Sequence, residues 1–324
     1  MSSLSNFSSP SKIDRVNGMI YGVAMGDALG IPHEFFRVTP KLNYTGIINT
    51  DHELIVQWQY QSTTIAPASI SDDTAMTLAM LEELLDNNMK YDSNRMSMAY
   101  MKFANFSKVG MGRNTRRLFK GVKTLNGYKS RYKKFYSELT DCESNGSLMR
   151  ASPLVLLTKL EDDHMLSNPT QANADCNKIY YTLMQGIYKG VDKEQLKGDL
   201  LKLENINLEV SQAVRDSVDS SISRDITGKY KGWVVNSLYI ALKCFWKYDT
   251  MEDAMSHINQ ITGSDTDTNA AVCGSLFGAY LGLSGLQKEK FTSKNIEIIN
   301  THCPMGSKIK ELLQRYESYL NVKE

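Results

Sequence analysis

Apolar residues recur at steps of three and four along most of this chain, and the alternation typical of strands is rare. The pattern predicts an all-α fold. The clearest helix is DDTAMTLAMLEELLDNN, in which Ala75, Leu78, Leu81 and Leu85 share one face. Further helices are predicted at 13–29, 95–106, 146–160, 176–189, 232–246, 252–260, 268–283 and 306–321.

Two stretches interrupt this pattern. The first, 37–68, contains Pro40, Gly46 and Pro67 around scattered apolar residues, and the second, 107–145, is rich in Gly, Lys and Tyr. Both are predicted to be long loops with short helices, and loops of this length are usually functional or disordered. Residues 1–12 are rich in serine and are predicted to be a disordered lead. We expect residues 13–324 to form a single domain.

Two of the predicted helices carry glycine at every fourth position. These are Gly22, Gly26 and Gly30 in the first, and Gly274, Gly278 and Gly282 in the second. Each glycine costs about 1 kcal/mol relative to alanine inside a helix, so the pattern predicts two helix backbones in close contact. A membrane-spanning pair is not supported, because Asp27 interrupts the first segment and the second is too short.

The second glycine-bearing helix begins with a cluster of oxygen ligands. In GSDTDTNAAV, Asp265, Asp267 and Asn269 match three positions of a calcium-binding loop, but Ala270 and Leu276 stand where that loop needs Gly and Glu. The calcium interpretation is therefore rejected. Two interpretations stay open: capping of the helix N-terminus, and one half of a metal site.

A second such cluster supports the metal interpretation. SISDDTAM sets Ser71, Asp72 and Asp73 at the start of another helix, again without His or Cys. An all-oxygen donor set fits Mg²⁺ or Mn²⁺ better than zinc or copper. Four carboxylates around a single ion would repel one another, so two ions roughly 3.5 to 4 Å apart are expected if the clusters converge.

Charge and cysteine content narrow the class of protein. Lys and Arg total 37 against 36 Asp and Glu, so no global field favours nucleic acid or an anionic membrane. The five cysteines form no CxxC pair, which fits a reducing compartment. We expect a cytoplasmic monomer. The basic, aromatic stretch GYKSRYKKFY (127–136) could contact nucleic acid, but a solvated loop or a contact with an acidic protein face fits the neutral chain better.

Four motifs occur in order between about residue 13 and residue 285: GVAMGDALGIPHEF, SDDTAMTLAM, SNGSLMRASPL and GSDTDTNAAVCGSLFGAYLG. This set resembles the ADP-ribosylglycohydrolase family, which includes the dinitrogenase reductase activating glycohydrolase and the ADP-ribosyl-acceptor hydrolases. The resemblance implies a compact all-α orthogonal bundle. It also implies a binuclear Mg or Mn centre at the base of a cleft for ADP-ribose.

The resemblance further implies roles for particular residues. The implied metal ligands are Ser71, Asp72, Asp73, Asp265, Asp267 and Thr268. Glu34 would lie beside the metals as a catalytic or gating carboxylate, with Asp72 as a second catalytic residue. The implied substrate-binding residues are Gly112, Asn145, Gly146 and Ser147. Without the resemblance, 145–147 would be interpreted as an ordinary helix cap, and Arg150 as either a phosphate ligand or a partner for a buried acid.

The chain departs from the family pattern at three positions. Asn168 precedes Pro169 where many members have His, Gly110 stands where relatives often have Asp, and Ser71 replaces a common Thr. The change at Asn168 puts contacts to the adenosine side of the ligand in doubt, and the change at Gly110 removes an acidic group that some members use. Ser71 keeps the hydroxyl oxygen, and none of the three changes removes a metal carboxylate. His33 could line the cleft, although a supporting or exposed position is favoured. The five histidines show neither metal spacing nor a triad pattern.

The expected activity is hydrolysis of the bond between ribose and a modified side chain, with release of ADP-ribose. Relatives divide between arginine N-glycosides and serine O-glycosides, and the SNGSLMR form of the loop favours arginine. Two alternatives are weaker. A non-catalytic ADP-ribose-binding or structural relative would be expected to lack metal carboxylates, and an unrelated two-metal phosphoesterase would commonly use His. The partner is the ADP-ribose moiety of a modified protein.

Overall fold

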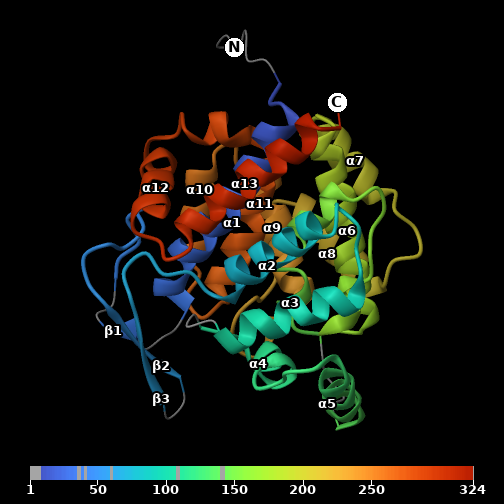
Figure 1. The fold of residues 1–324 in the computed structure, drawn as a ribbon. Coiled ribbons are helices and arrows are strands. Elements are labelled where there is room, and N and C mark those ends of the chain that lie inside the picture. The colour runs from blue at the N-terminus through green and yellow to red at the C-terminus, as the bar shows by residue number, and fades with distance from the viewer. Residues whose placement is uncertain are drawn as a thin grey trace, which may run out of the picture.

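The computed structural model describes residues 9–34, 38–39, 42–58, 61–106, 110–138 and 143–323. Thirteen α-helices dominate these residues, which confirms the all-α prediction (Figure 1). The helices are α1 (Lys12–Glu34), α2 (Asp72–Asp86), α3 (Ser93–Phe106), α4 (Arg113–Phe119), α5 (Leu125–Glu138), α6 (Gln171–Tyr188), α7 (Lys193–Leu201), α8 (Leu208–Val218), α9 (Val234–Lys247), α10 (Met251–Asn259), α11 (Thr266–Leu286), α12 (Lys290–Thr301) and α13 (Gly306–Asn321). The N-terminal lead falls mostly on residues 1–8, outside the described residues; Ser9 already accepts a hydrogen bond from Arg15 Nη2 at 2.9 Å.

The antiparallel pair α1 and α11 forms the centre of the molecule (Figure 1). A Cβ atom at Gly22 would lie 2.0 Å from the carbonyl oxygen of Gly274, and one at Gly26 would lie 2.1 Å from that of Ala270. No side chain fits into such contacts, so the prediction of two closely packed backbones is confirmed. The prediction that this segment is too short to span a membrane is wrong, because α11 is long and apolar enough to do so. However, 72% of its apolar 18-residue window is buried inside the protein, as in a core helix.

We expect Gly22→Ala to lower the free energy of unfolding by about 1–3 kcal/mol or more, because the helices must separate to admit the methyl group. Gly198→Ala in α7 is the matched control, since its Cβ would meet no atom within 4 Å. That change should raise the free energy of unfolding by about 0.4–1 kcal/mol. Urea unfolding followed by circular dichroism measures both; equal effects would contradict the close packing.

The other helices surround this pair. Helices α6, α9 and α10 contact α11, whereas α2, α12 and α13 contact α1. One contiguous apolar core runs through these contacts. The four described cysteines, Cys176, Cys244, Cys273 and Cys303, are buried within it as free thiols.

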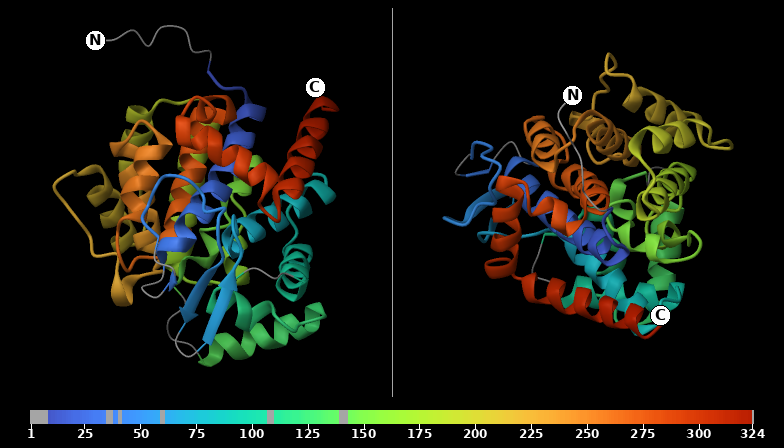
Figure 2. Two further views of the ribbon diagram at one scale, coloured as in Figure 1. Left: turned by 90° about the vertical axis from the view of Figure 1, so that its left-hand side faces the viewer. Right: turned by 90° about the horizontal axis from the view of Figure 1, so that it is seen from above.

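A small antiparallel sheet corrects the prediction for 37–68. Its strands are β1 (Val38–Thr39), β2 (Leu54–Trp58) and β3 (Gln61–Ile65), and it projects from the helical body (Figure 2). The register pairs Val38 with Val56 and Leu54 with Ile65. The strands are too short for alternation to be visible in the sequence. Among their side chains that the structure describes, only Leu54 is buried, against Leu42 and Ile65.

The prediction of a helix over 146–160 is wrong. This segment contains short 3₁₀ turns, η1 (Asn145–Ser147) and η2 (Ser152–Leu156), and further turns follow at η3 (Asp163–Leu166) and η4 (Gly228–Tyr230). Pro153 lacks the N–H that an α-helix needs at that position. The loop predicted for 107–145 instead contains α4 and α5.

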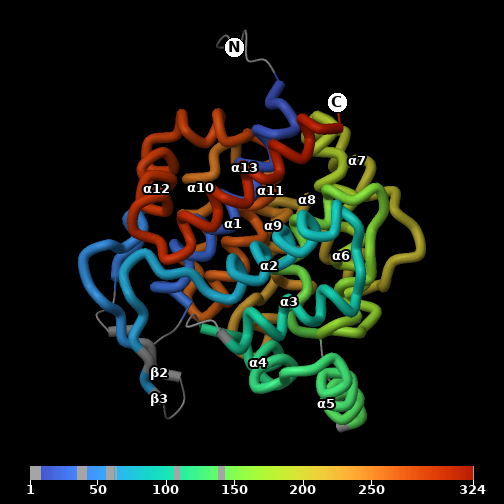
Figure 3. Tube along the Cα trace, viewed as in Figure 1, coloured from blue at the N-terminus to red at the C-terminus, as the bar shows by residue number. Residues whose placement is uncertain are grey.

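The stretch GYKSRYKKFY lies within α5 rather than in a loop, at the outer edge of the helical body (Figure 3). Its apolar face consists of Tyr128, Tyr132, Phe135 and Tyr136. Aromatic residues have only moderate helix propensity, which explains why the pattern was hard to identify. Helices α7, α8 and α12 were also not predicted.

Candidate active site

Three helix ends meet at one place and bring the two predicted acidic clusters together. Glu34 ends α1, Asp265 and Asp267 begin α11, and Asp72 and Asp73 begin α2. Glu34, Asp265 and Asp267 each place a carboxylate oxygen within 4.8 Å of the other two. The close packing of α1 and α11 causes this arrangement, because a Cβ at Gly30 would lie 2.3 Å from Asp267 Cα.

The start of α2 is held by a short network around Ser71. The Ser71 hydroxyl donates to Asp73 Oδ2 at 2.9 Å and accepts from the Asp73 N–H at 3.2 Å. Asp73 Oδ1 is buried and has no hydrogen-bond partner. Asp72 Oδ2 accepts from the Gly112 N–H at 3.0 Å. Ser71 therefore acts as a helix cap, while one oxygen of Asp73 remains available to a ligand.

Asp27 belongs to this cluster, although it was not identified as a site residue from the sequence. It is fully buried in α1 and accepts hydrogen bonds from the Ser71 N–H (3.0 Å), the Thr74 N–H (3.0 Å) and the Thr74 hydroxyl (2.6 Å). It thus ties the start of α2 to α1. The available signal was a single charged residue in an otherwise apolar, glycine-rich segment.

The acidic groups raise one another's pKa values. Burial, followed by the carboxylates of Asp265 and Asp73, raises the pKa of Glu34 well above its usual range. Burial, followed by Glu34, Asp265 and Asp73, does the same to the pKa of Asp267. The pKa of Asp73 is raised by burial, Asp27, Asp72 and Asp265. The coulombic interaction of Asp73 with Asp265 shows that the two clusters are close neighbours.

The residues fit a divalent metal centre. Buried carboxylates that repel one another need a compensating cation or must take up protons. The donor set consists of carboxylate and hydroxyl oxygens, which suits Mg²⁺ or Mn²⁺. The unpartnered oxygen of Asp73 is the clearest sign of a missing partner. Thr268 is buried beside these groups, and its N–H donates to Asp267 Oδ1 at 2.8 Å.

A pH dependence follows for the metal-free protein. Burial raises the pKa of Asp72 to about 6, although the hydrogen bond from Gly112 opposes this effect, and the pKa values of Asp73, Asp267 and Glu34 are also raised. A carboxyl with a raised folded-state pKa contributes stability that is fully present below its unfolded pKa of about 4 and is lost as the pH rises through the folded value.

We therefore expect added Mg²⁺ or Mn²⁺ to raise the melting temperature more at pH 7.5 than at pH 5.5, because metal must displace protons at the lower pH. Scanning calorimetry in EDTA and in excess metal, at both pH values, measures this difference. An equal metal effect at both pH values would show that these carboxyls are not the groups that bind it.

The predicted substrate loop lies beside the acidic cluster. Asn145 Nδ2 donates to Asp265 Oδ2 at 2.8 Å and to the Ser237 hydroxyl at 2.9 Å. Ser147 Oγ accepts from Asn173 Nδ2 at 2.9 Å and from Asn177 Nδ2 at 3.1 Å. Asn145 is therefore a direct link between the loop and one of the predicted metal ligands.

Other predicted residues have structural partners. The Gly112 N–H is used by Asp72, and Gly146 accepts a hydrogen bond from Arg150 through its carbonyl oxygen. Arg150 is fully buried and pairs with Asp163, so it is the partner of a buried acid rather than an accessible phosphate ligand. Asn168 is also buried, and its side chain donates to the backbone and hydroxyl oxygens of Ser144.

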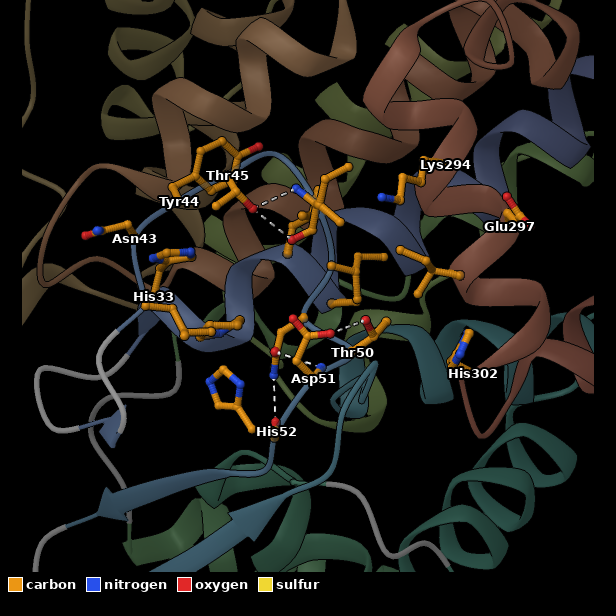
Figure 4. Close-up of a pocket in the computed structure, with 18 of the residues that line it drawn as sticks. His33, Asn43, Tyr44, Thr45, Thr50, Asp51, His52, Lys294, Glu297 and His302 are labelled. Carbon is orange, nitrogen blue, oxygen red and sulfur yellow. Dashed lines mark hydrogen bonds between the residues drawn. The ribbon is translucent and has the colours of Figure 1, made fainter.

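A pocket of about 450 Å³ lies away from the carboxylates, between the end of α1, residues 42–52 and α12 (Figure 4). His33 lines this pocket and meets the ring of Tyr44 edge-on, with 5.5 Å between ring centroids. His52 and Lys294 are also part of its wall. The pocket contains none of the predicted metal ligands, so it is not the acidic site.

Comparison with known proteins agrees with the motifs. Residues 8–311 match the family model for ADP-ribosylglycohydrolase. A protein of Acanthamoeba polyphaga mimivirus assigned to the ADP-ribosyl glycohydrolases is 24% identical over 293 residues, covering 82% of this chain and 86% of that protein. The ADP-ribosylarginine hydrolase Tri1 of Pseudomonas putida is 25% identical over 305 residues, covering 86% and 73%.

The fold is also found among solved structures. A chain of an ADP-ribosylglycohydrolase-related protein complex superposes with a TM-score of 0.68 and 20% identity, covering 94% of this chain and 97% of that one. The family match extends over nearly the whole sequence and includes both acidic helix starts and the turn 144–147. This chain therefore belongs to the ADP-ribosylglycohydrolase family.

Proposed function

We propose that the protein is a metal-dependent hydrolase that removes ADP-ribose from modified protein side chains, and from arginine N-glycosides in preference to serine O-glycosides. The convergence of carboxylates from α1, α2 and α11 carries this proposal, because burial and mutual repulsion raise the pKa values of Glu34, Asp73 and Asp267, and a bound cation relieves such repulsion. Family membership supports the glycohydrolase class.

Six residues would hold two Mg²⁺ ions, or Mn²⁺ in their place. These are Ser71, Asp72, Asp73, Asp265, Asp267 and Thr268. Bound metal would supply a template for the ribose hydroxyls and would favour activation of a water molecule. The hydrogen bond from Asn145 Nδ2 to Asp265 Oδ2 fixes the orientation of that carboxylate and leaves its other oxygen free of this contact.

Glu34 is proposed to move the proton in this reaction. Its pKa is raised well above the usual carboxyl range by burial and by Asp265 and Asp73, which favours the protonated form of this side chain. Its carboxylate could donate to the leaving side chain or accept from the attacking water. The surrounding negative charge would favour a transition state with positive charge on the ribose.

Residues 144–147 are proposed to bind the ADP-ribose moiety, with Asn145, Gly146 and Ser147 in contact with the ligand and Gly112 near its diphosphate. Backbone N–H groups in turns of this kind bind phosphate without a net positive charge, which fits a chain with formal net charge +1. Asp72 accepts a hydrogen bond from the Gly112 N–H, and its carboxylate is proposed to act with Glu34 in catalysis.

The arginine preference rests on the SNGSLMR form of the loop and is supported by one relative that is named an ADP-ribosylarginine hydrolase. The test is incubation of the protein and excess Mg²⁺ or Mn²⁺ with two peptides of equal sequence, one ADP-ribosylated on arginine and the other on serine. Faster release of ADP-ribose from the arginine peptide is expected. Faster release from the serine peptide would reject the preference for arginine. Binding of ADP-ribose without any release would favour the non-catalytic alternative.

A further inference from the structure

A buried ion pair lies behind the substrate loop. Arg150 Nε donates to Asp163 Oδ2 at 2.8 Å, and both side chains are at most 2% exposed. The other oxygen, Asp163 Oδ1, accepts from the hydroxyls of Tyr91 and Tyr100, each at 3.0 Å. The opposite charges of Arg150 and Asp163 therefore compensate each other inside the protein. Neither residue belongs to the two acidic helix starts.

Arg150 also contacts the turn 144–147, besides a further hydrogen bond from Nη2 to the Asp163 carbonyl oxygen at 3.3 Å. Nη1 donates to the carbonyl oxygen of Gly146. Nη2 donates to Ser167 Oγ at 2.9 Å, which in turn donates to Asn168 Oδ1 at 2.7 Å. Asn168 Nδ2 then donates to the Ser144 carbonyl at 3.1 Å and to its hydroxyl at 2.9 Å. One guanidinium thus fixes the turn directly and through a relay.

The opposite side of the turn faces the acidic cluster. Asn145 Nδ2 donates to Asp265 Oδ2 at 2.8 Å, and the Asn145 N–H donates to the Gly232 carbonyl at 2.9 Å. The Ser144 hydroxyl accepts from Asn114 Nδ2 at 3.1 Å, near the start of α4. A shift of the turn would therefore also move the donor that orients Asp265.

We propose that Arg150, held by Asp163, is a positioning residue that sets the turn 144–147 against the acidic cluster for binding of ADP-ribose. A buried ion pair is a weak source of stability, because desolvation offsets much of its attraction, so stability alone does not explain this one. The planar guanidinium reaches Asp163, Gly146 and Ser167 in three directions at once, which a lysine ammonium on a flexible chain cannot reproduce. The role in ligand binding rests on the proposed function.

The test compares Arg150→Lys with Tyr91→Phe in the full-length protein. Tyr91→Phe removes a hydrogen bond to the same Asp163 but none to the turn, so it controls for disturbance of the buried pair. We expect Arg150→Lys to weaken ADP-ribose binding, measured by calorimetry, by about tenfold or more and to raise KM more than it lowers kcat. Tyr91→Phe should bind as the wild type does. Wild-type affinity in Arg150→Lys, or equal losses in both variants, would overturn the proposal.

Hydrogen exchange of the backbone amides of 145–149 provides a readout that needs no ligand. Each variant is measured at a temperature equally far below its own melting temperature. Exchange of these amides should be faster in Arg150→Lys than in Tyr91→Phe, and equal exchange would overturn the positioning role. Should Arg150→Lys fold poorly, Ser167→Ala replaces it, because this change breaks only the relay. It should weaken ADP-ribose binding and speed amide exchange in the same direction, but by less. If the wild type neither binds nor releases ADP-ribose, the proposed function fails, whereas the exchange result still decides whether Arg150 positions the turn.

Discussion

Asp267→Ala is expected to abolish the rise in melting temperature that Mg²⁺ or Mn²⁺ gives the wild type, and with it the release of ADP-ribose. A metal that binds only the native state stabilises it by about 2.7 kcal/mol at a hundredfold excess over Kd. Asp267 lies in the first turn of α11, with a carboxylate oxygen within 4.8 Å of those of Glu34 and Asp265. Without it, the start of α11 loses a carboxylate that metal would tie to α2.

The metal-free variant provides a second readout. Burial, Glu34, Asp265 and Asp73 raise the pKa of Asp267, so its charge is unfavourable in the absence of metal. Removing it should therefore not lower the melting temperature in EDTA. Asp253→Ala, in the exposed first turn of α10, is the matched control and should respond to metal as the wild type does. A metal-dependent rise of wild-type size in Asp267→Ala would reject Asp267 as a ligand.

The second large effect is expected for Glu34→Gln. The amide keeps the shape of the side chain but can no longer transfer the proton, and general acid–base catalysis typically contributes about 10²- to 10⁴-fold. We expect turnover to fall within that range while the fold and most of the ADP-ribose affinity remain. Loss of one like charge should also lessen the repulsion on Asp267, whose pKa is raised by Glu34.

Three measurements separate the roles of Glu34: single-turnover release of ADP-ribose, ADP-ribose affinity and metal affinity, the last two by calorimetry. Near-normal release in a well-folded Glu34→Gln protein would reject the catalytic role. Equal loss of binding and release would make Glu34 a ligand-binding residue only. A large loss of metal affinity would instead make it a metal ligand, an outcome that its closeness to Asp265 and Asp267 makes important to measure. The structural alternative for Glu34 is an ion pair with Arg37, one helical turn later, and Arg37 lies outside the described residues.

The sequence was sufficient to predict the central helices and the two acidic helix starts, because both depend on local signals. Glycine at every fourth position has few explanations other than close backbone packing, and that packing brings Glu34 to Asp267. The clusters of Ser, Thr and Asp at the starts of two predicted helices can also be identified in the sequence. The prediction that the two clusters meet needed the family resemblance, since nothing local relates residue 72 to residue 265.

The residues that could not be predicted depend on tertiary contacts. Asp27 is a single acid in an apolar helix, and its role follows only from the start of α2 lying against it. Asp163 becomes the partner of Arg150 because the chain between them folds as 3₁₀ turns rather than as the predicted helix. Among the described side chains of β2 and β3, Leu54 is buried and Ile65 is partly buried, so little in the sequence shows the alternation that identifies a half-buried strand.

The most direct measurement is the release of free ADP-ribose from an ADP-ribosyl-arginine peptide by protein stripped of metal with EDTA, before and after addition of Mg²⁺ or Mn²⁺. The convergence of Glu34, Asp265 and Asp267 with the start of α2 predicts no release before addition and full release afterwards, with none from Asp267→Ala under either condition. Undiminished release in EDTA, or no release from the wild type with either metal, would contradict a metal-dependent ADP-ribosylglycohydrolase.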